Sequence, residues 1–437
     1  MGLVATGLAL FVIAFATSGA AGVFARVWAP RLGLVDRPGG RKKHAAPIPL
    51  GGGLAIWFAV VPVVAIGVAA IIALGPVLPA EISIHINGIK KQGLELALIL
   101  GSSTLIMIVG LIDDRFGLGW RIRLALQFVF ASAVVAGGVR VTLFPPFSNV
   151  WFTSVLTVLW IVGLTNSFNF LDNMDELAAT VGLIAAALFA AAQLIVGSLF
   201  VPAVLIVLIG ALAGFLIHNR TPARLFMGDA GSNFLGFLLG SLTVAGTFYR
   251  EGFSKSSVLS PLLVMAVPLY DTISVIFIRL REGRSPFQAD RRHLSHRLVD
   301  RGLSSKQAVH AIALVTLAAG LGSLLLPALG VAGALVVAAQ TTLILGVVAI
   351  LETSNGPILA NDRTDIAFEN TSRSINHHVP ADFGSLRSDA IAGDRFVSSD
   401  VLVGDTNALA DAPCDESIAE RETNGFAIDG ERPDGQK

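Results

Sequence analysis

Cysteine is almost absent from this 437-residue sequence, and the single one, Cys414, lies near the C-terminus. One cysteine cannot form an internal disulfide, and it leaves the redox compartment undetermined. Charged residues are also scarce, at 14% of the chain, whereas 54% of the residues are hydrophobic and the mean hydropathy is +0.72. These proportions exclude an ordinary soluble globular protein.

Basic residues are missing before Arg26, where the chain reads MGLVATGLALFVIAFATSGAAG. A cleaved secretory signal begins with positive charge, so we interpret this stretch as a first membrane span. Apolar stretches of about twenty residues, long enough to cross roughly 30 Å of hydrocarbon, recur along the chain. Because a spanning helix satisfies its own backbone hydrogen bonds, the sequence predicts an all-α polytopic membrane protein with about 11 spans. The expected spans lie near 3–24, 52–75, 94–112, 124–140, 151–166, 177–196, 199–217, 233–249, 258–280, 307–327 and 329–351.

The net charge of zero conceals two regions of opposite charge. Residues 1–351 contain 24 Lys and Arg against 14 Asp and Glu, whereas residues 352–437 contain 7 against 17. We therefore expect a transmembrane domain, 1–351, followed by an acidic tail, 352–437, which lacks the apolar surface needed to fold and should be disordered. If the N-terminus is outside, the inner connections contain 19 Lys and Arg and the outer ones 5. The positive-inside rule then predicts an outside N-terminus and a cytoplasmic tail.

Two local signals concern the shape of the spans and their connections. On the outer side, EISIHINGIKK alternates isoleucine with other residues up to Asn87-Gly88. This pattern is typical of a β-hairpin, so we expect a small outer hairpin near 81–91. In span nine, Pro268 predicts a kink. Such a kink would open a lateral groove for a lipid and bring Asp271 toward the inner face.

Polar residues gather on the predicted inner side, although the chain is largely apolar. NSFNFLDNMDEL (166–177) is one cluster, and others occupy 36–53, 110–127, 218–237 and 289–304. Carboxylates in a membrane protein are costly unless they are paired or bound to a cation. A few oxygen ligands open to water suit Mg²⁺ held jointly with substrate phosphates, and the basic and histidine clusters suit anionic phosphates. The sequence therefore predicts a site for Mg²⁺ and a diphosphate-containing substrate. Its inner-face acids are Asp113, Asp114, Asp172, Asp175 and Asp229.

Each cluster also has an ordinary structural explanation. An aspartate pair at a helix end can be a solvated loop, basic residues can anchor the inner face, and GDAGSNFLGF can serve close helix packing. A lone H-x-x-H is more often a polar helix face than a metal site. These explanations do not account for all the clusters lying on one face. A secondary transporter with buried acids is another alternative, but transporters tend to have paired halves, and none are evident here.

Taken together, the motifs resemble those of the polyprenyl-phosphate N-acetylhexosamine-1-phosphate transferases of glycosyltransferase family 4, from about Asp36 to Ser304. The resemblance implies transfer of a sugar-1-phosphate from a UDP-sugar to undecaprenyl phosphate with release of UMP. It favours N-acetylglucosamine (GlcNAc), and it implies the first membrane step of an envelope glycan such as lipopolysaccharide or teichoic acid. The enzyme would lie in a bacterial plasma membrane with its site facing the cytoplasm. A peptidoglycan lipid I synthase-like transferase and a catalytically inactive scaffold are the alternatives.

The resemblance also implies residue roles. GLIDDRFGL matches the aspartate pair of the family, so Asp113 and Asp114 are expected to be catalytic, with Asp172. Asn169 and Asp229 are the implied ligands of Mg²⁺, with Mn²⁺ as the alternative ion. Substrate binding is implied for Lys43, Arg123, Asp175, Asn219, Phe226, Arg292, His293 and His296. Phe226 resembles the aromatic residue that stacks on uracil, and Arg123 stands where the family has lysine.

Two departures from the family pattern are visible. The family usually reads D-G-x-D-G-L where this chain has DNMDEL, so Asn173 and Glu176 replace glycines. Relatives usually show a third histidine at Ser295. In a regular helix His293 and His296 would share a face and Ser295 would point elsewhere, so we expect Ser295 to be peripheral.

The chemistry of the acceptor favours direct attack on the donor. A phosphate monoester has a second pKa of about 6 and is largely ionised at neutral pH, so it needs little help from a base. Asp113 or Asp114 would orient it, and a covalent aspartyl-phosphate intermediate is the competing scheme. The expected partners are the UDP-sugar, the polyprenyl phosphate and the lipid bilayer, without nucleic acid, and a homodimer is among the assemblies considered.

Overall fold

A computed structural model describes residues 2–37, 46–74, 86–142, 147–246, 248–286 and 291–353. Each of the eleven predicted apolar segments falls largely within a helix or a pair of consecutive helices. Among the described residues, eight helices are long and apolar enough to cross a membrane, or nine if one bent pair counts as a single span. The chain is thus an all-α polytopic membrane protein, while the number of spans and their orientation stay predictions.

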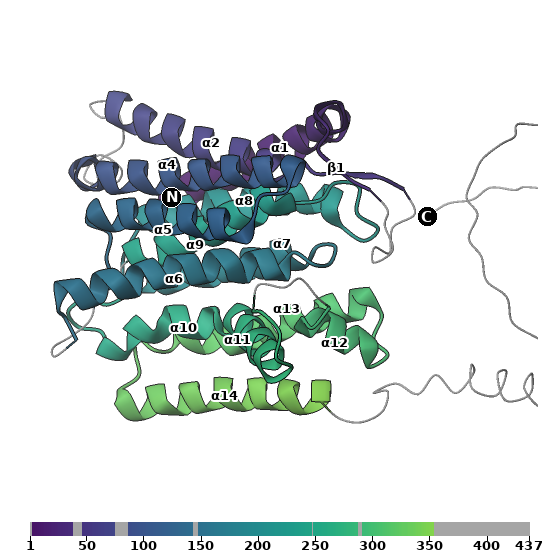
Figure 1. Ribbon diagram of the computed structural model, residues 1–437. Helices are drawn as coiled ribbons and strands as arrows, with labels where there is room; N and C mark the ends of the chain where they lie inside the picture. Colours follow the sequence, from purple (N-terminus) through teal and green to yellow (C-terminus); the bar gives the residue numbers. More distant parts are fainter. Residues whose placement is uncertain are drawn as a thin grey trace, which may run out of the picture. The chain divides into compact units, whose positions relative to one another are not determined.

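The helices lie roughly parallel in the bundle (Figure 1). In chain order they are α1 (Gly2–Trp28), α2 (Gly52–Leu74), α4 (Ile86–Phe116), α5 (Trp120–Ala136), α6 (Val150–Leu171), α7 (Leu177–Ile195), α8 (Phe200–Asn219), α9 (Gly228–Ala245), α10 (Ser260–Val264), α11 (Ala266–Arg281), α12 (Leu294–Asp300), α13 (Ser305–Leu321) and α14 (Val331–Thr353), with the 3-10 helices η1 (Ala29–Leu32), η3 (Lys255–Leu259) and η4 (Gly322–Leu324).

Helix α9 is buried along nearly its whole length and packs against α2, α4 and α6. Two glycines allow this close packing at its first turn. A Cβ atom on Gly110 of α4 would lie 2.5 Å from the Cα of Ala230, and one on Gly53 of α2 would lie 2.4 Å from the backbone nitrogen of Gly231. Because small residues let helix backbones approach one another, α2 and α4 fix the start of α9.

The predicted outer hairpin near 81–91 is wrong for residues 86–91, which form the first turns of α4. Residues 81–85 lie outside the described part of the chain. Helix α4 extends over 31 residues, and it buries Ile89 and Leu96, which are seven residues apart as on one helix face. A lone two-stranded hairpin is marginally stable, whereas extending this helix satisfies the same backbone groups.

A short antiparallel sheet occurs elsewhere, where the sequence did not predict one. Strand β1 (Val35–Asp36) pairs with β2 (Ile48–Pro49), and the next residue, Leu50, forms a bridge with Phe226. The connection after α1 is thereby joined to the segment that precedes α9. Figure 1 shows β1 at the same end of the bundle as α12.

Predicted span nine is broken at Met265, with a bend of 58° between Lys255–Val264 and Ala266–Arg281. The expected kink is therefore present, three residues before Pro268. Proline is tolerated in the first turn of a helix, where its missing N–H has no helical partner to lose. Beyond the bend, Asp271 contacts the start of α12. Its predicted position near the inner face depends on the orientation in the membrane and stays a prediction. The lateral groove for a lipid stays a prediction.

The last described helix ends at Thr353, two residues beyond the expected domain boundary. Glu352 in its last turn is buried, accepts a hydrogen bond from the Tyr270 hydroxyl at 2.7 Å and pairs with Arg297 at 3.0 Å. Glu352 therefore belongs to the helical body and joins α14 to α11 and α12. The predicted disorder of the tail concerns residues 354–437, which lie outside the described part.

Candidate active site

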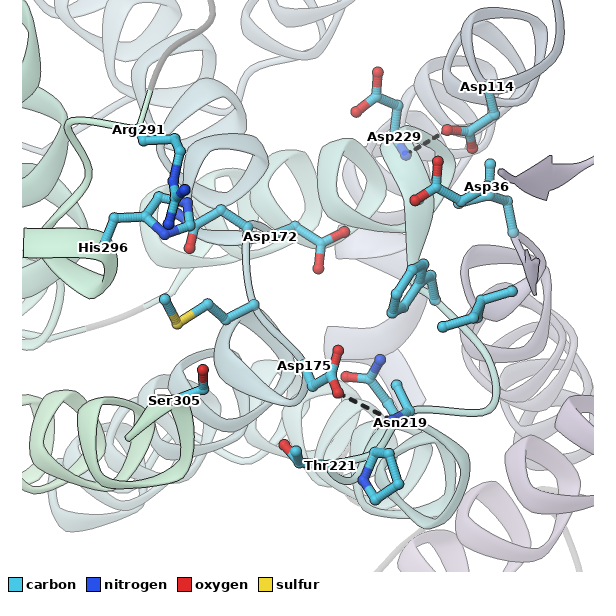
Figure 2. A pocket seen from close by; sticks show the side chains of 18 residues that line it. Asp36, Asp114, Asp172, Asp175, Asn219, Thr221, Asp229, Arg291, His296 and Ser305 are labelled. Atoms are coloured by element: carbon cyan, nitrogen blue, oxygen red, sulfur yellow. Dashed lines mark hydrogen bonds between the residues drawn. The ribbon is translucent and has the colours of Figure 1, made fainter. Parts of the chain in front are cut away.

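A cavity of about 730 Å³ opens between the start of α9, the loop between α6 and α7, the strand β1 and the α12 region. Pockets for small molecules typically measure about 300–1,000 Å³, so this cavity has the size of a small-molecule site. Figure 2 shows Asp36, Asp114 and Asp229 on one side of the cavity and Arg291 and His296 on the other. The cavity therefore has an acidic wall and a basic wall.

Asp114, at the end of α4, caps the N-terminus of α9. Its two carboxylate oxygens accept hydrogen bonds from the backbone N–H groups of Asp229 at 2.8 Å and Ala230 at 3.1 Å. Gly228 has a φ of +70°, and a Cβ atom there would lie 2.6 Å from Asp114 Oδ2, so the approach requires glycine. A carboxylate is stabilised by the free N–H groups and the dipole of a helix N-terminus. Asp114 thus lines the cavity and also positions Asp229.

Asp113 is buried and is not among the residues that line the cavity. It accepts a hydrogen bond from the backbone of Leu118 and pairs with Arg123. The same Arg123 nitrogen pairs with Asp229 at 2.8 Å. Its guanidinium therefore bridges Asp113 and Asp229, so in this structure Arg123 is bound within the protein and does not line the cavity.

Asn169, near the end of α6, donates hydrogen bonds to Asp229 at 2.7 Å and to the Ser232 hydroxyl at 3.0 Å. The two implied metal ligands are therefore adjacent. Nowhere in the described ranges do three or more His, Cys, Asp or Glu side chains gather tightly enough to hold a metal by themselves. Mg²⁺ keeps several waters and binds through one or two carboxylates together with substrate phosphates, so the oxygen donors of Asp229 and Asn169 fit this ion.

Asp172 follows the last residue of α6 and lies between the acidic and basic walls (Figure 2). Burial raises the pKa of its carboxyl well above the usual range, and the carboxylates of Asp229, Asp114 and Asp175 raise it further. Like charges held together disfavour ionisation. This part of the cavity is therefore electrostatically suited to receive a cation.

The third wall of the cavity is built from the α6–α7 loop and the segment after α8. Asp175 accepts a hydrogen bond from the backbone N–H of Ala223 at 3.0 Å. Asn219 accepts one from the backbone of Glu176 at 2.8 Å and donates one to the carbonyl of Leu225 at 2.9 Å. Asp175 and Asn219 line the cavity as predicted, and both also hold its wall together. The predicted aromatic residue, Phe226, lines the cavity as well.

Glu176, one of the departures from the family pattern, has a φ of +59°. This left-handed conformation favours glycine, which explains the glycine that the family usually has here. The Glu176 carboxylate accepts hydrogen bonds from the Thr221 hydroxyl at 2.8 Å and from its backbone N–H at 3.3 Å. These bonds offset part of the strain and join the loop to the segment after α8.

The regular helix expected through 293–296 is wrong, because α12 begins at Leu294 and His293 is extended, with ψ of 150°. Asp271 of α11 accepts a hydrogen bond from the Leu294 N–H at 2.6 Å and bonds the His293 ring at 3.0 Å. This carboxylate caps α12 and holds His293 out of the helix. His293 is buried against Phe170 and does not line the cavity, whereas His296 does.

Ser295 was expected to be peripheral, and this expectation is also wrong. Its side chain is buried, and its hydroxyl donates a hydrogen bond to Asn173 Oδ1 at 2.5 Å. Two of the three residues that depart from the family pattern therefore contact each other and join α12 to the α6–α7 loop. Sequence reasoning missed this pair because its members are separated by 122 positions.

Two arginines at the start of the α12 region differ in position. Arg292 pairs with Glu282 at 2.8 Å and its side chain is 47% exposed, whereas Arg291 lines the cavity. The sequence analysis assigned substrate binding to Arg292, whereas in this structure Arg291 and not Arg292 is among the residues that line the cavity. Asp36 also lines the cavity; the sequence placed it in a polar cluster without giving it a role. Lys43 lies outside the described residues.

Comparison with known proteins identifies the family of this chain. The model of glycosyl transferase family 4 matches residues 96–247. A probable undecaprenyl-phosphate N-acetylglucosaminyl 1-phosphate transferase of Bacillus subtilis is 32% identical over 291 residues, 65% of this chain and 75% of the relative. This chain belongs to glycosyl transferase family 4. The predicted family is thus confirmed.

Other relatives of this family 4 protein come from different bacteria. A decaprenyl-phosphate N-acetylglucosaminephosphotransferase of Mycolicibacterium smegmatis is 37% identical over 338 residues, 70% of this chain and 78% of the relative. An undecaprenyl-phosphate alpha-N-acetylglucosaminyl 1-phosphate transferase of Escherichia coli is 29% identical over 315 residues, 68% and 77% of the two chains. The family model match contains Asp114 and Asp229 of the acidic wall, but it begins after Asp36 and ends before α12 and the basic wall.

Proposed function

We propose that this family 4 protein transfers GlcNAc-1-phosphate from UDP-GlcNAc to a polyprenyl phosphate and releases UMP. The observation that carries the proposal is one cavity with an acidic wall, where Asp114 holds Asp229 at the start of α9, facing a basic wall of Arg291 and His296. The relatives reported above are named for GlcNAc-1-phosphate transfer to undecaprenyl or decaprenyl phosphate. Transfer by this chain would begin an envelope glycan.

The reaction moves one phosphoryl group between two oxygens. An oxygen of the acceptor phosphate attacks the β-phosphorus of UDP-GlcNAc, the bond from that phosphorus to the bridging oxygen breaks, and UMP leaves with the electron pair. Negative charge spreads over the phosphoryl oxygens as the bond breaks, so positive groups placed there stabilise the transition state. Arg291 supplies such a group on the basic wall, and His296 on the same wall offers a ring N–H as a hydrogen-bond donor. Bound at Asp229 and Asn169, Mg²⁺ would supply further positive charge to the diphosphate.

The carboxylates of Asp113 and Asp114 are both bonded within the protein, and this supports direct attack by the acceptor phosphate. Both carboxylate oxygens of Asp113 already bond Leu118 and Arg123, and both oxygens of Asp114 bond the N-terminus of α9. A covalent aspartyl-phosphate would require one of these carboxylates to leave its partners. We therefore assign Asp113 and Asp114 as positioning residues and the acceptor phosphate as the nucleophile.

The uracil is assigned to the third wall, at Phe226. An aromatic ring that stacks on a base contributes about 1–3 kcal/mol. Asn219 and Asp175 lie beside this position and hold the surrounding backbone. Uracil at Phe226 would leave the donor diphosphate between the acidic and basic walls.

The cavity is inferred to face the cytoplasm of a bacterial plasma membrane. The connections at the cavity end contain most of the Lys and Arg residues, as the positive-inside rule requires of a cytoplasmic face. Exposed aromatic residues support the placement of both bilayer surfaces, with Phe116 and Trp120 toward the cavity end and Phe147 and Trp151 at the start of α6.

An assay of the purified full-length protein tests the proposal. UDP-GlcNAc, UDP-N-acetylgalactosamine and UDP-glucose are each supplied with undecaprenyl or decaprenyl phosphate, and UMP and the lipid product are quantified by mass spectrometry. We expect one UMP for each lipid-diphosphate-GlcNAc, with UDP-GlcNAc preferred. UMP release without a lipid product, or no reaction with any donor, would contradict the proposed transfer. Exchange of labelled UMP into UDP-GlcNAc without acceptor would instead support the covalent intermediate.

A further inference from the structure

Three amide side chains are hydrogen-bonded to one another between α5, α6 and α9, and we call Gln127, Asn166 and Asn233 the amide layer. Asn166 donates to Gln127 Oε1 at 2.6 Å, and Gln127 donates to Asn233 Oδ1 at 3.2 Å. Asn233 donates to the backbone carbonyl of Asp229 at 2.7 Å. Gln127 is 3% exposed and Asn233 5%. Buried amides are costly unless they are bonded, so these bonds constrain the three helices.

Asp229 and the two residues that bond its carboxylate, Arg123 and Asn169, form a second group, which we call the Asp229 group. Each member of the amide layer lies one helical turn from a member of the Asp229 group on the same helix. The pairs are Arg123 with Gln127 on α5, Asn169 with Asn166 on α6, and Asp229 with Asn233 on α9. Residues three or four positions apart share a helix face. Each of the three helices thus contributes one side chain to the Asp229 group and, one turn away along the helix, one amide to the amide layer.

The three residues of the Asp229 group are bonded to one another, as the three amides of the amide layer are. Arg123 and Asn169 both donate to the Asp229 carboxylate, at 2.8 Å and 2.7 Å. Asp229 therefore links the two groups: its carboxylate bonds Arg123 and Asn169, and its backbone carbonyl bonds Asn233 of the amide layer. A rotation of α5, α6 or α9 that displaced a contact to the Asp229 carboxylate would also break a bond in the amide layer.

We propose that the amide layer positions the cation site, with Gln127 as its central positioning residue. Gln127 is the member that bonds both of the others, so its amide joins α5 to α6 and to α9. The inference rests on the proposed function, because it takes Asn169 and Asp229 as ligands of the divalent cation. Loss of the partners behind metal ligands typically lowers metal affinity about 10- to 100-fold.

Gln127→Met tests the inference, since methionine has a similar length and cannot make these hydrogen bonds. The readout is direct binding of Mn²⁺ to the purified full-length protein, measured from the electron paramagnetic resonance signal of the free ion. We expect the Kd for Mn²⁺ to rise about 10- to 100-fold. The KM for UDP-GlcNAc at saturating metal should change much less, because the nucleotide is bound by other residues.

Gln193→Met is the matched control, with the same substitution at another fully buried glutamine. Gln193 lies in α7 and packs against Gly246, away from the cavity lining. Its replacement should leave the Kd for Mn²⁺ unchanged. Thermal unfolding of both variants verifies that they are folded.

If Gln127→Met does not fold, Asn166→Ala replaces it. This variant removes the bond from α6 to Gln127, together with the bond to the Val162 carbonyl, and keeps the bond between Gln127 and Asn233. It should weaken Mn²⁺ binding by a smaller factor. Mn²⁺ binding of a folded Gln127→Met, or of Asn166→Ala in its place, that equals the wild-type value would overturn the inference. Failure of the wild-type protein to bind Mn²⁺, both alone and in the presence of UDP-GlcNAc, would instead overturn the cation site of the proposed function, and the inference with it. The two failures are therefore distinguishable.

Discussion

Helices α9 and α12 both begin near the cavity, and each is capped by an aspartate from another helix. Asp114 of α4 caps α9, and Asp271 of α11 caps α12. The caps are alike, but their surroundings differ. Helix α9 has 18 residues, is buried almost throughout and packs through glycine contacts, whereas α12 has 7 residues.

The side chains that hold the two helices differ in the same way. At the start of α9, Asp229 is bonded by residues of α4, α5 and α6. Helix α12 is held by Ser295 and Arg297 through bonds to Asn173 and Glu352. A small cation needs its ligands at fixed positions, while a diphosphate presents several oxygens and tolerates more variation in the groups around it. We therefore assign the cation to the α9 side and the phosphates to the α12 side.

The largest effect is expected from Asp229→Asn, which keeps the shape of the side chain and removes its charge. Loss of a group behind a metal ligand lowers affinity about 10- to 100-fold, so loss of a ligand charge should lower kcat by more than about 100-fold. Release of UMP at saturating substrates measures this. Asp300→Asn, at the exposed end of α12, is the matched control and should be silent. Near-wild-type turnover of a folded Asp229→Asn would show that the cation is assigned to the wrong wall.

The α12 side is tested by its two neighbouring arginines. Arg291→Ala removes a positive charge from the cavity, and hydrogen bonds to charged groups contribute about 1.5–3 kcal/mol. We expect kcat/KM to fall about 10- to 100-fold. Arg292→Ala should change it less than about threefold, because exposed ion pairs such as that with Glu282 contribute only about 0–1 kcal/mol. The reverse order, measured by steady-state kinetics, would place Arg292 at the phosphates.

The acids of the site could be predicted from the sequence, whereas the choice between Arg291 and Arg292 could not. The inner-face acids were visible because carboxylates are rare in so apolar a chain, and Asp114, Asp172, Asp175 and Asp229 do line one cavity. The sequence could not separate Arg291 from Arg292, because the choice depends on where α12 begins. That position is set by Asp271, a residue of another helix.

In the fold, too, features set by local sequence were predicted, whereas features set by contacts between distant residues were not. Helical segments were predictable from hydropathy because each satisfies its own backbone. The 81–91 hairpin was wrong at 86–91 because the Asn87-Gly88 signal is local, whereas the length of α4 depends on what it packs against. The cap from Asp114 to α9 and the contact between Ser295 and Asn173 join distant parts of the chain, and no local pattern indicates them.

A smaller effect is expected at the glycine contact that fixes α9. Gly110→Ala would place a Cβ atom 2.5 Å from backbone atoms at the start of α9, and overpacking of this kind typically costs about 1–3 kcal/mol. We expect a lower temperature of thermal unfolding and a higher Mg²⁺ requirement for activity. Gly101→Ala, on the same helix with no neighbour within 4 Å of its Cβ position, should leave the Mg²⁺ requirement unchanged. It should not lower the unfolding temperature, because alanine is favoured over glycine inside a helix. Equal behaviour of the two variants would mean that packing at Gly110 does not hold Asp229.

The smallest effect is expected from the acidic tail. Truncation after Thr353 keeps Glu352 and should leave kcat, KM and thermal stability unchanged. Truncation after Leu351 also removes Glu352, which leaves Arg297 without its buried carboxylate, and breaking a buried pair typically costs about 3–5 kcal/mol of stability. Loss of activity in the protein truncated after Thr353 would show that the tail itself contributes to the site.

The most direct test of the account is a cryo-electron microscopy structure of the full-length protein with UDP-GlcNAc and Mg²⁺. The account predicts a cation in contact with Asp229, the diphosphate between that cation and the Arg291–His296 wall, and the uracil on Phe226. A donor bound outside this cavity, or one whose diphosphate lies away from both Asp229 and Arg291, would contradict it.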